Sequence, residues 1–296
     1  MTAEAYAAAA GLVERSAAAY VSGVPEDPAD AGFFGPGSVT WRVSTDLGRP
    51  VAGLRALMLQ ALHPLAMAGV DQHSNWRADP VGRLAATGGY LATITFGDRA
   101  AAERAAARVR RIHEHITGTD TITGQRYEAS DPALLLWVHA TLVESGIVAA
   151  GMFGTPLSAP EADGYVAEMV AAAELVGVPA GRVPASVSDL ESYLTESRPG
   201  LRCTPAAAES MAYLLDPPGL DEDIAEIWAD IREGVVATLP SWARDMYGYR
   251  AAPLTPARQT EIRQALGVLD VVFLGEPGVL EARQRITLRM RATRQV

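Results

Sequence analysis

Lysine is absent from this sequence of 296 residues, so every basic residue in it is an arginine. The absence excludes Schiff-base chemistry on a lysine amine and any lysine metal ligand. Cysteine is almost absent as well, because Cys203 stands alone. A single cysteine excludes an intrachain disulfide and a cysteine-rich zinc or iron–sulfur centre, and the missing C-x-x-C-H motif excludes covalent attachment of a haem.

Positive charge is scarce relative to negative charge. The chain has 25 basic residues against 35 acidic ones, a formal net charge of -10 and a pI of about 5.0. No basic field attracts phosphate, so the balance argues against nonspecific nucleic-acid binding. Hydrophobic residues make up 49% of the chain, which is enough for a sizeable core and excludes global disorder.

Clean membrane-spanning runs are also missing. The segments Leu54–Val70 and Leu134–Met152 are strongly apolar, but charged or polar residues interrupt both. We interpret them as buried helices of a large helical core and expect no integral membrane segment. The interrupting residues are Arg55, Gln60 and His63 in the first segment and His139 and Glu144 in the second.

The first 23 residues do not resemble a targeting segment. They contain Glu4, Glu14 and Arg15 and lack a basic start followed by an unbroken apolar stretch. The pattern is that of an amphipathic helix. We therefore expect a soluble, cytoplasmic protein.

Proline, glycine and short polar residues divide the remaining sequence into helices. Asp79-Pro80 is an example, with Asp79 as N-cap and Pro80 at the first helical position. We find no convincing strand pairs, hairpin turns or internal repeats. The predicted fold is all-α, with one helical domain at 37–250, an N-terminal helix and loop at 1–36, and C-terminal helices at 251–296 packed on the same domain.

The stretch 77–118 carries the most promising chemistry. Its first helix presents Arg83 and Thr87 one turn apart on one face. A second helix, predicted over 100–116 with Val109 and Ile112 on its buried face, ends near His113 and His115. These two histidines point to different sides of an intact helix, so only one of them can serve a given metal, and His113 is the candidate. An imidazole opposite an arginine and a threonine could hold a metal-centred cofactor and a polar oxidant.

Two further histidines leave alternatives open. A helix is predicted over Val51–Val70, and Pro64 should kink it or leave a carbonyl unpaired. His63, beside that proline, is either a hydrogen-bonded core histidine or a residue that lines a cavity. His139 lies in an apolar helix and needs a partner, either for structural hydrogen bonding or as part of a cavity wall.

Several ordered segments together resemble a known family, the rubber oxygenase (latex-clearing protein) and MpaB-like oxygenase catalytic domain. The resemblance covers roughly residues 37–250, and no single segment would suffice for it. The segments are GSVTWRV (37–43), LRALMLQALHPLAMAGVDQHS (54–74), the spaced DP..RL..T..Y (79–90), FG (96–97), VRRIHEHITG (109–118), YEASDPALLLWVHATLVES (127–145) and GVPAGRVPAS (177–186).

The resemblance implies a distantly globin-like helical fold that holds a noncovalent b-type haem. It implies that His113 is the axial ligand and that Arg83 and Thr87 lie near the haem. It also implies oxygenase chemistry, because characterised relatives cleave carbon–carbon double bonds with dioxygen. This sequence departs from the rubber-cleaving branch, which has a lysine as distal ligand where Ala86 stands here. An open coordination position, or a different distal ligand such as His63 or His139, would follow.

The function expected from these features is a haem b-dependent oxygenase that acts with dioxygen on a hydrophobic small molecule, saturated or unsaturated. The rival hypotheses are a non-catalytic haem- or small-ligand-binding protein and a helical domain without cofactor. A non-haem diiron enzyme is a weaker option, because the sequence has no E-x-x-H pair of the kind that helical diiron sites use.

Overall fold

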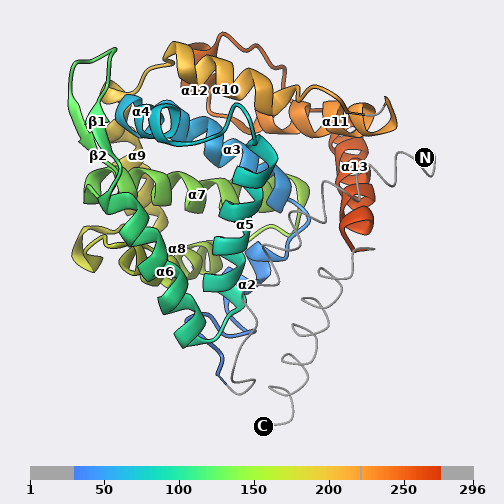
Figure 1. Ribbon diagram of the computed structural model, residues 1–296. Coiled ribbons are helices and arrows are strands. Elements are labelled where there is room, and N and C mark those ends of the chain that lie inside the picture. Colours follow the sequence, from blue (N-terminus) through green and yellow to red (C-terminus); the bar gives the residue numbers. More distant parts are fainter. Residues whose placement is uncertain (1–29, 221, 275–296) are drawn as a thin grey trace.

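Helices dominate the computed structural model, which describes residues 30–220 and 222–274 (Figure 1). The predicted all-α class is confirmed. Helices expected over 1–23 and 281–294 lie outside the described residues. The described helices are α2 (Val39–Ser44), α3 (Arg49–Ala61), α4 (Pro64–His73), α5 (Pro80–Phe96), α6 (Arg99–Glu114), α7 (Pro132–Phe153), α8 (Ala159–Val176), α9 (Val187–Ser197), α10 (Pro205–Leu215), α11 (Glu222–Thr238), α12 (Ser241–Tyr247) and α13 (Pro256–Leu274), with 3-10 turns η1 (Ala180–Arg182) and η2 (Arg198–Gly200).

Helix starts follow the cap chemistry written in the sequence. The side chains of Asp79, Asp131 and Thr204 each accept a hydrogen bond from a backbone N–H in the first turn of the helix that follows. Each cap precedes a proline at the first helical position, where the missing N–H costs nothing. The start of α5 at Asp79-Pro80 is therefore confirmed.

The predicted continuous helix over Val51–Val70 is wrong. The chain breaks into α3 and α4, which meet at 102°, and Pro64 becomes the first residue of α4. Proline can neither donate a hydrogen bond to the preceding turn nor fit against its carbonyl. The carbonyls freed by the break find other donors: Gln60 O accepts from Trp137 Nε1 at 3.2 Å, and Leu62 O accepts from the Arg202 N–H at 2.8 Å.

A small antiparallel hairpin corrects the expectation that no strands pair. Strand β1 (Thr117–Thr119) pairs with β2 (Arg126–Glu128), so that Gly118 lies opposite Tyr127. The preceding helix, α6, ends at Glu114, before the hairpin begins. A Cβ on Gly118 would stand 2.5 Å from the Tyr127 hydroxyl, so the Tyr127 side chain lies in the space that a larger residue at 118 would need. Strands of three residues are too short for an alternating pattern to reveal them.

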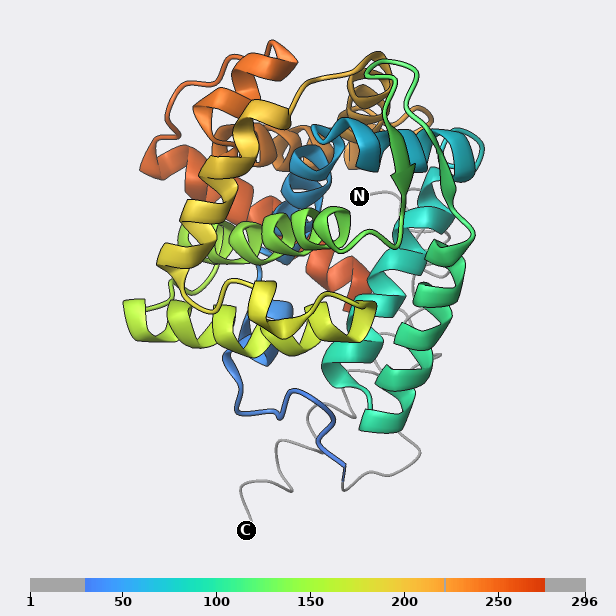
Figure 2. The same ribbon diagram turned by 90° about the vertical axis from the view of Figure 1, so that its left-hand side faces the viewer.

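Helix α7 is the centre around which the other helices pack. It contacts α3 extensively and also packs against α2, α8, α9 and α13, and it crosses the middle of the molecule in both views (Figures 1 and 2). By length and composition α7 could cross a membrane, and the bent pair of α3 and α4 passes the same test. Most of the apolar window of α7 is buried inside the protein, as expected of a core helix.

A buried ion pair ties α7 to α3. Arg55 on α3 is 1% exposed, and its guanidinium binds both carboxylate oxygens of Glu144 on α7. The same guanidinium donates to Ser145 Oγ at 2.7 Å and to Thr238 O of α11 at 3.0 Å. The charge is therefore fully partnered, as a buried arginine requires.

Removing one partner of this ion pair should destabilise the fold. Arg55→Met would leave the carboxylate of Glu144 without its cation, and because Glu144 keeps some solvent exposure we expect a loss of about 3 kcal/mol, the lower part of the range for buried pairs. Urea unfolding measures the loss. The double variant Arg55→Met/Glu144→Gln should recover about 1 kcal/mol or more, because no charge is then left unpaired. Equal stability of the single and double variants would contradict the assignment.

Candidate functional site

Helices α5 and α6 form the antiparallel hairpin that carries three of the predicted site residues. They join through Gly97 and Asp98, and Asp98 caps α6 by accepting from the Ala101 N–H. Near this loop the two helices pack closely, and Figure 1 shows them diverging toward the other end. Figure 2 shows that both helices lie on the same side of α7. Arg83 and His113 both lie toward the divergent end. The structure thus brings these two predicted residues to the same end of the hairpin.

Arg83 is a half-buried cation without an anionic partner among the described residues. Its guanidinium donates to the hydroxyl of Ser74, at the end of α4. Burial lowers the pKa of Arg83. A guanidinium in this setting is suited to an anionic or strongly polar group that enters from outside the chain, such as a carboxylate.

Thr87 lies one turn beyond Arg83 on α5 and is exposed. Its hydroxyl donates to the Arg83 carbonyl at 3.1 Å, within its own helix. Ala86, where the rubber-cleaving branch has lysine, is exposed too. This part of α5 therefore offers an open face with one hydroxyl and no amine.

His113 lies in the last turn of α6 and is half-buried. Its Nδ1 atom is buried and has no hydrogen-bond partner within the described part of the chain. Burial lowers the pKa of His113, which favours the neutral imidazole, the form that binds a metal. His115 differs: it is exposed, and its Nδ1 lies 2.7 Å from the Arg111 carbonyl. The prediction that Ile112 is buried is wrong, because 48% of its surface is exposed.

His63 occupies the corner between α3 and α4. Its side chain makes no capping bond to α4, and its Nδ1 is buried without a partner among the described residues. Burial lowers the pKa of His63 despite the opposing attraction of Asp131. The ring lies against Trp137 of α7, with 6.2 Å between ring centroids. Of the two hypotheses for His63, a core histidine with a satisfied hydrogen bond is therefore not supported.

His139 is 8% exposed and lies near the start of α7. Burial lowers its pKa to about 4, so the imidazole is neutral at physiological pH. Glu144, on the same helix, pairs with Arg55, so its carboxylate is committed to that ion pair and not to His139.

A short path through the backbone links His113 to the start of α7. The Ile116 N–H donates to the His113 carbonyl, and the Ala129 N–H donates to the Ile116 carbonyl, both within 3.1 Å. Asp131 then caps α7, and its negative charge acts on His63 to raise the pKa of that imidazole. The end of α6, the α3–α4 corner and the first turns of α7 are therefore neighbours.

Sequence reasoning missed Tyr90 as a site residue, although it lies on the same helix as Arg83. Its hydroxyl is buried and has no hydrogen-bond partner within the described residues. Its position two turns after Arg83 was the available clue, because residues seven apart share a helix face.

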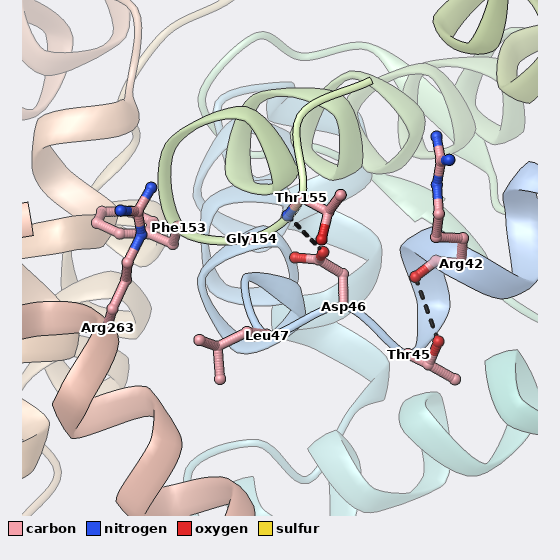
Figure 3. A pocket seen from close by; sticks show the side chains of 8 residues that line it. All are labelled: Arg42, Thr45, Asp46, Leu47, Phe153, Gly154, Thr155 and Arg263. Carbon is pink, nitrogen blue, oxygen red and sulfur yellow. Dashed lines mark hydrogen bonds between the residues drawn. The ribbon is translucent and has the colours of Figure 1, made fainter. Parts of the chain in front are cut away.

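A pocket of about 530 Å³ lies elsewhere, at the C-terminal end of α7 (Figure 3). Asp46 in its centre has both oxygens committed, one to the Gly48 N–H and one to the Thr155 N–H, each at 2.8 Å. The pocket is separated from His139 by about 20 Å of helix, at roughly 1.5 Å per residue. We therefore assign the pocket to the joint between α2, α7 and α13. The residues that line it are Arg42, Thr45, Asp46, Leu47, Phe153, Gly154, Thr155 and Arg263.

No three histidine, cysteine, aspartate or glutamate side chains come together as metal ligands in residues 30–220 and 222–274. Each imidazole of this site therefore lies outside any cluster of three or more potential metal ligands in the described residues. Any metal held here by His113 would have to bring most of its other ligands with it.

The comparisons with known proteins bear on the nature of the site. The model of the ER-bound oxygenase mpaB/B′/rubber oxygenase catalytic domain matches residues 41–271, from α2 into α13. The chain belongs to this family. No curated protein and no solved structure shows a significant match. The family match makes the protein an oxygenase catalytic domain.

The stability of the protein should fall in mild acid because His139 is buried as a neutral base. Its folded pKa of about 4 lies below the unfolded value of 6.5, so stability is full above pH 6.5 and falls as the pH drops toward 4. The expected loss is about 2 kcal/mol between pH 7 and pH 5. His139→Leu should flatten this pH dependence in urea unfolding of the cofactor-free protein. An unchanged slope in the variant would show that the imidazole gains protons freely in the folded state.

Proposed function

We propose that this oxygenase domain uses noncovalent haem b and dioxygen to oxidise a hydrophobic small molecule. The observation that carries the proposal is the buried Nδ1 of His113, which has no hydrogen-bond partner in the described residues. A desolvated polar atom without a partner costs about 1–3 kcal/mol, so its retention suggests a ligand that satisfies the imidazole.

The side chains around His113 suit a haem. His113 would hold the iron, and Arg83, which lacks an anionic partner among the described residues, would bind a propionate. Thr87 would offer a hydroxyl to the space between the helices once its bond to the Arg83 carbonyl is released. Haem supplies the one-electron chemistry with dioxygen that amino-acid side chains lack.

An apolar substrate would fit the surroundings of α5, α6 and α7. The helices that face this region are lined with alanine, leucine, isoleucine and valine, and the core helix α7 leaves Val138 39% exposed. An apolar surface of this kind excludes water and favours a hydrocarbon chain. The substrate would be a lipid or isoprenoid with a carbon–carbon double bond as its reactive group.

A non-catalytic haem-binding protein is the second candidate. Ala86 and Thr87 are exposed, and an open face of this kind is compatible with storage of a ligand. The same open face is compatible with catalysis, so it gives this second function only weak support. Consumption of dioxygen by the haem-loaded protein with an unsaturated lipid separates the two functions.

His113→Ala should abolish most haem binding. The variant loses the proposed iron ligand, and the His113 Nδ1 that it removes has no hydrogen-bond partner among the described residues, so the fold should persist by circular dichroism. Haem per chain after expression with ample haem is the measurement. His115→Ala is the matched control, since His115 lies two positions along and is exposed, and it should retain haem. Haem lost from the control and kept in His113→Ala would reassign the ligand to His115.

The distal side of the haem should depend on His63 or His139. The chain has no lysine, and the methyl group of Ala86 cannot bind iron. If His63 binds the iron, the ferric protein will be low-spin, and His63→Ala will convert it to high-spin because one axial nitrogen is lost. If the position is open or holds water, the wild type will already be high-spin and will bind cyanide readily. A low-spin spectrum that neither His63→Ala nor His139→Ala alters would contradict both assignments.

A further inference from the structure

Tyr90 lies on the same face of α5 as Arg83, two turns closer to the loop at which α5 and α6 pack together. Exposure falls along this face, from Ala86 and Thr87, which are exposed, through the half-buried Tyr90 to Ile94, which is 3% exposed. Figure 1 shows the same change in the spacing of the helices, which are apart near the start of α5 and close at its end. Tyr90 is thus at the inner limit of the open part of the hairpin.

The Tyr90 hydroxyl is a polar atom in apolar surroundings. Its ring packs against a cluster of buried apolar side chains on α6, α7 and α8. The hydroxyl itself is buried and has no partner among the described residues. Phenolic hydroxyls are normally partnered when buried, so this atom is unsatisfied in a place where phenylalanine would pack as well.

The electrostatic surroundings identify what the hydroxyl can bind. Burial raises the pKa of Tyr90 to about 12, against the opposing effect of the nearby Arg110 cation. The phenol therefore keeps its proton at physiological pH and can donate a hydrogen bond. The positive charge of Arg110 favours a partner with partial negative charge, so the complementary group is an oxygen acceptor such as a carbonyl.

We propose that Tyr90 is a substrate-positioning residue whose hydroxyl donates a hydrogen bond to a carbonyl oxygen on an otherwise apolar substrate. The inference rests on the proposed function and narrows its substrate class. Pure hydrocarbons present no acceptor to this hydroxyl. The natural substrate is therefore an oxygenated lipid or isoprenoid, bound with its polar end at the inner limit of the hairpin.

Two matched probes test the proposal on the full-length protein. 2-Undecanone and 1-undecene each have eleven carbons. The ketone carries a carbonyl oxygen at C2, and the alkene has a terminal double bond instead. Wild-type protein should bind the ketone about five- to tenfold more tightly, the ratio that one hydrogen bond of ordinary strength gives. Tyr90→Phe should remove this preference and leave the affinity for the alkene unchanged. Tyr213→Phe, on helix α10, is the control and should keep the preference.

Thermal unfolding without ligand supplies a second measurement. Because the hydroxyl has no partner in the described part of the chain, Tyr90→Phe should be as stable as the wild type or more stable. A ketone preference that survives in Tyr90→Phe, its absence from the wild type, or a clear loss of stability in the variant would each overturn the proposal. Haem content, recorded in the same samples, tests the proposed function separately: a protein without haem whose ketone preference still depends on Tyr90 would refute the haem and sustain the positioning role.

Discussion

The pairing of Arg55 with Glu144 constrains the architecture on which the site depends. Arg55 is fixed by two carboxylate oxygens, a hydroxyl and a carbonyl from α7 and α11, so α3 has one allowed position along α7. Because Pro64 then turns α4 away at 102°, the corner that carries His63 is held against Trp137. The ion pair therefore positions a residue of the candidate site without belonging to it.

Two structural carboxylates accept hydrogen bonds on both oxygens, whereas three polar atoms of the candidate site have no hydrogen-bond partner within the described residues. Asp46 and Glu168 each accept backbone hydrogen bonds from a neighbouring segment, and both oxygens of each carboxylate are used. The atoms His63 Nδ1, His113 Nδ1 and Tyr90 Oη lack partners in the described residues and are grouped around α5, α6 and the start of α7. Trp76 Nε1 and Trp228 Nε1 are also buried without a partner in the described residues, so such atoms are not confined to the candidate site. A bound ligand would supply partners for the two imidazoles and the phenol.

Local sequence signals predicted most of the helices. They predicted few of the contacts between helices. Asp79-Pro80 gave the correct start of α5, because a cap and a proline act within one turn. The break at Pro64 was expected only as a kink, since its extent depends on whether Trp137 and Arg202 can satisfy the freed carbonyls. The exposure of Ile112 likewise depends on the divergence of two helices, which no periodicity encodes.

The candidate site likewise combines residues that the sequence predicted with one that only the structure revealed. His113, Arg83 and Thr87 were identified from a family resemblance and from helical spacing. Tyr90 shares the helix face of Arg83, but its unsatisfied hydroxyl became evident only in the structure. The isolation of the imidazoles then constrains the cofactor. A metal held by His113 alone would obtain its remaining ligands from outside the chain, and the porphyrin of the proposed haem would supply nitrogen ligands of its own. Diiron sites instead need several carboxylates and histidines from the helices, and no such group forms in the described residues. The single imidazole of His113 therefore fits the haem that we propose better than it fits a diiron centre built from side chains.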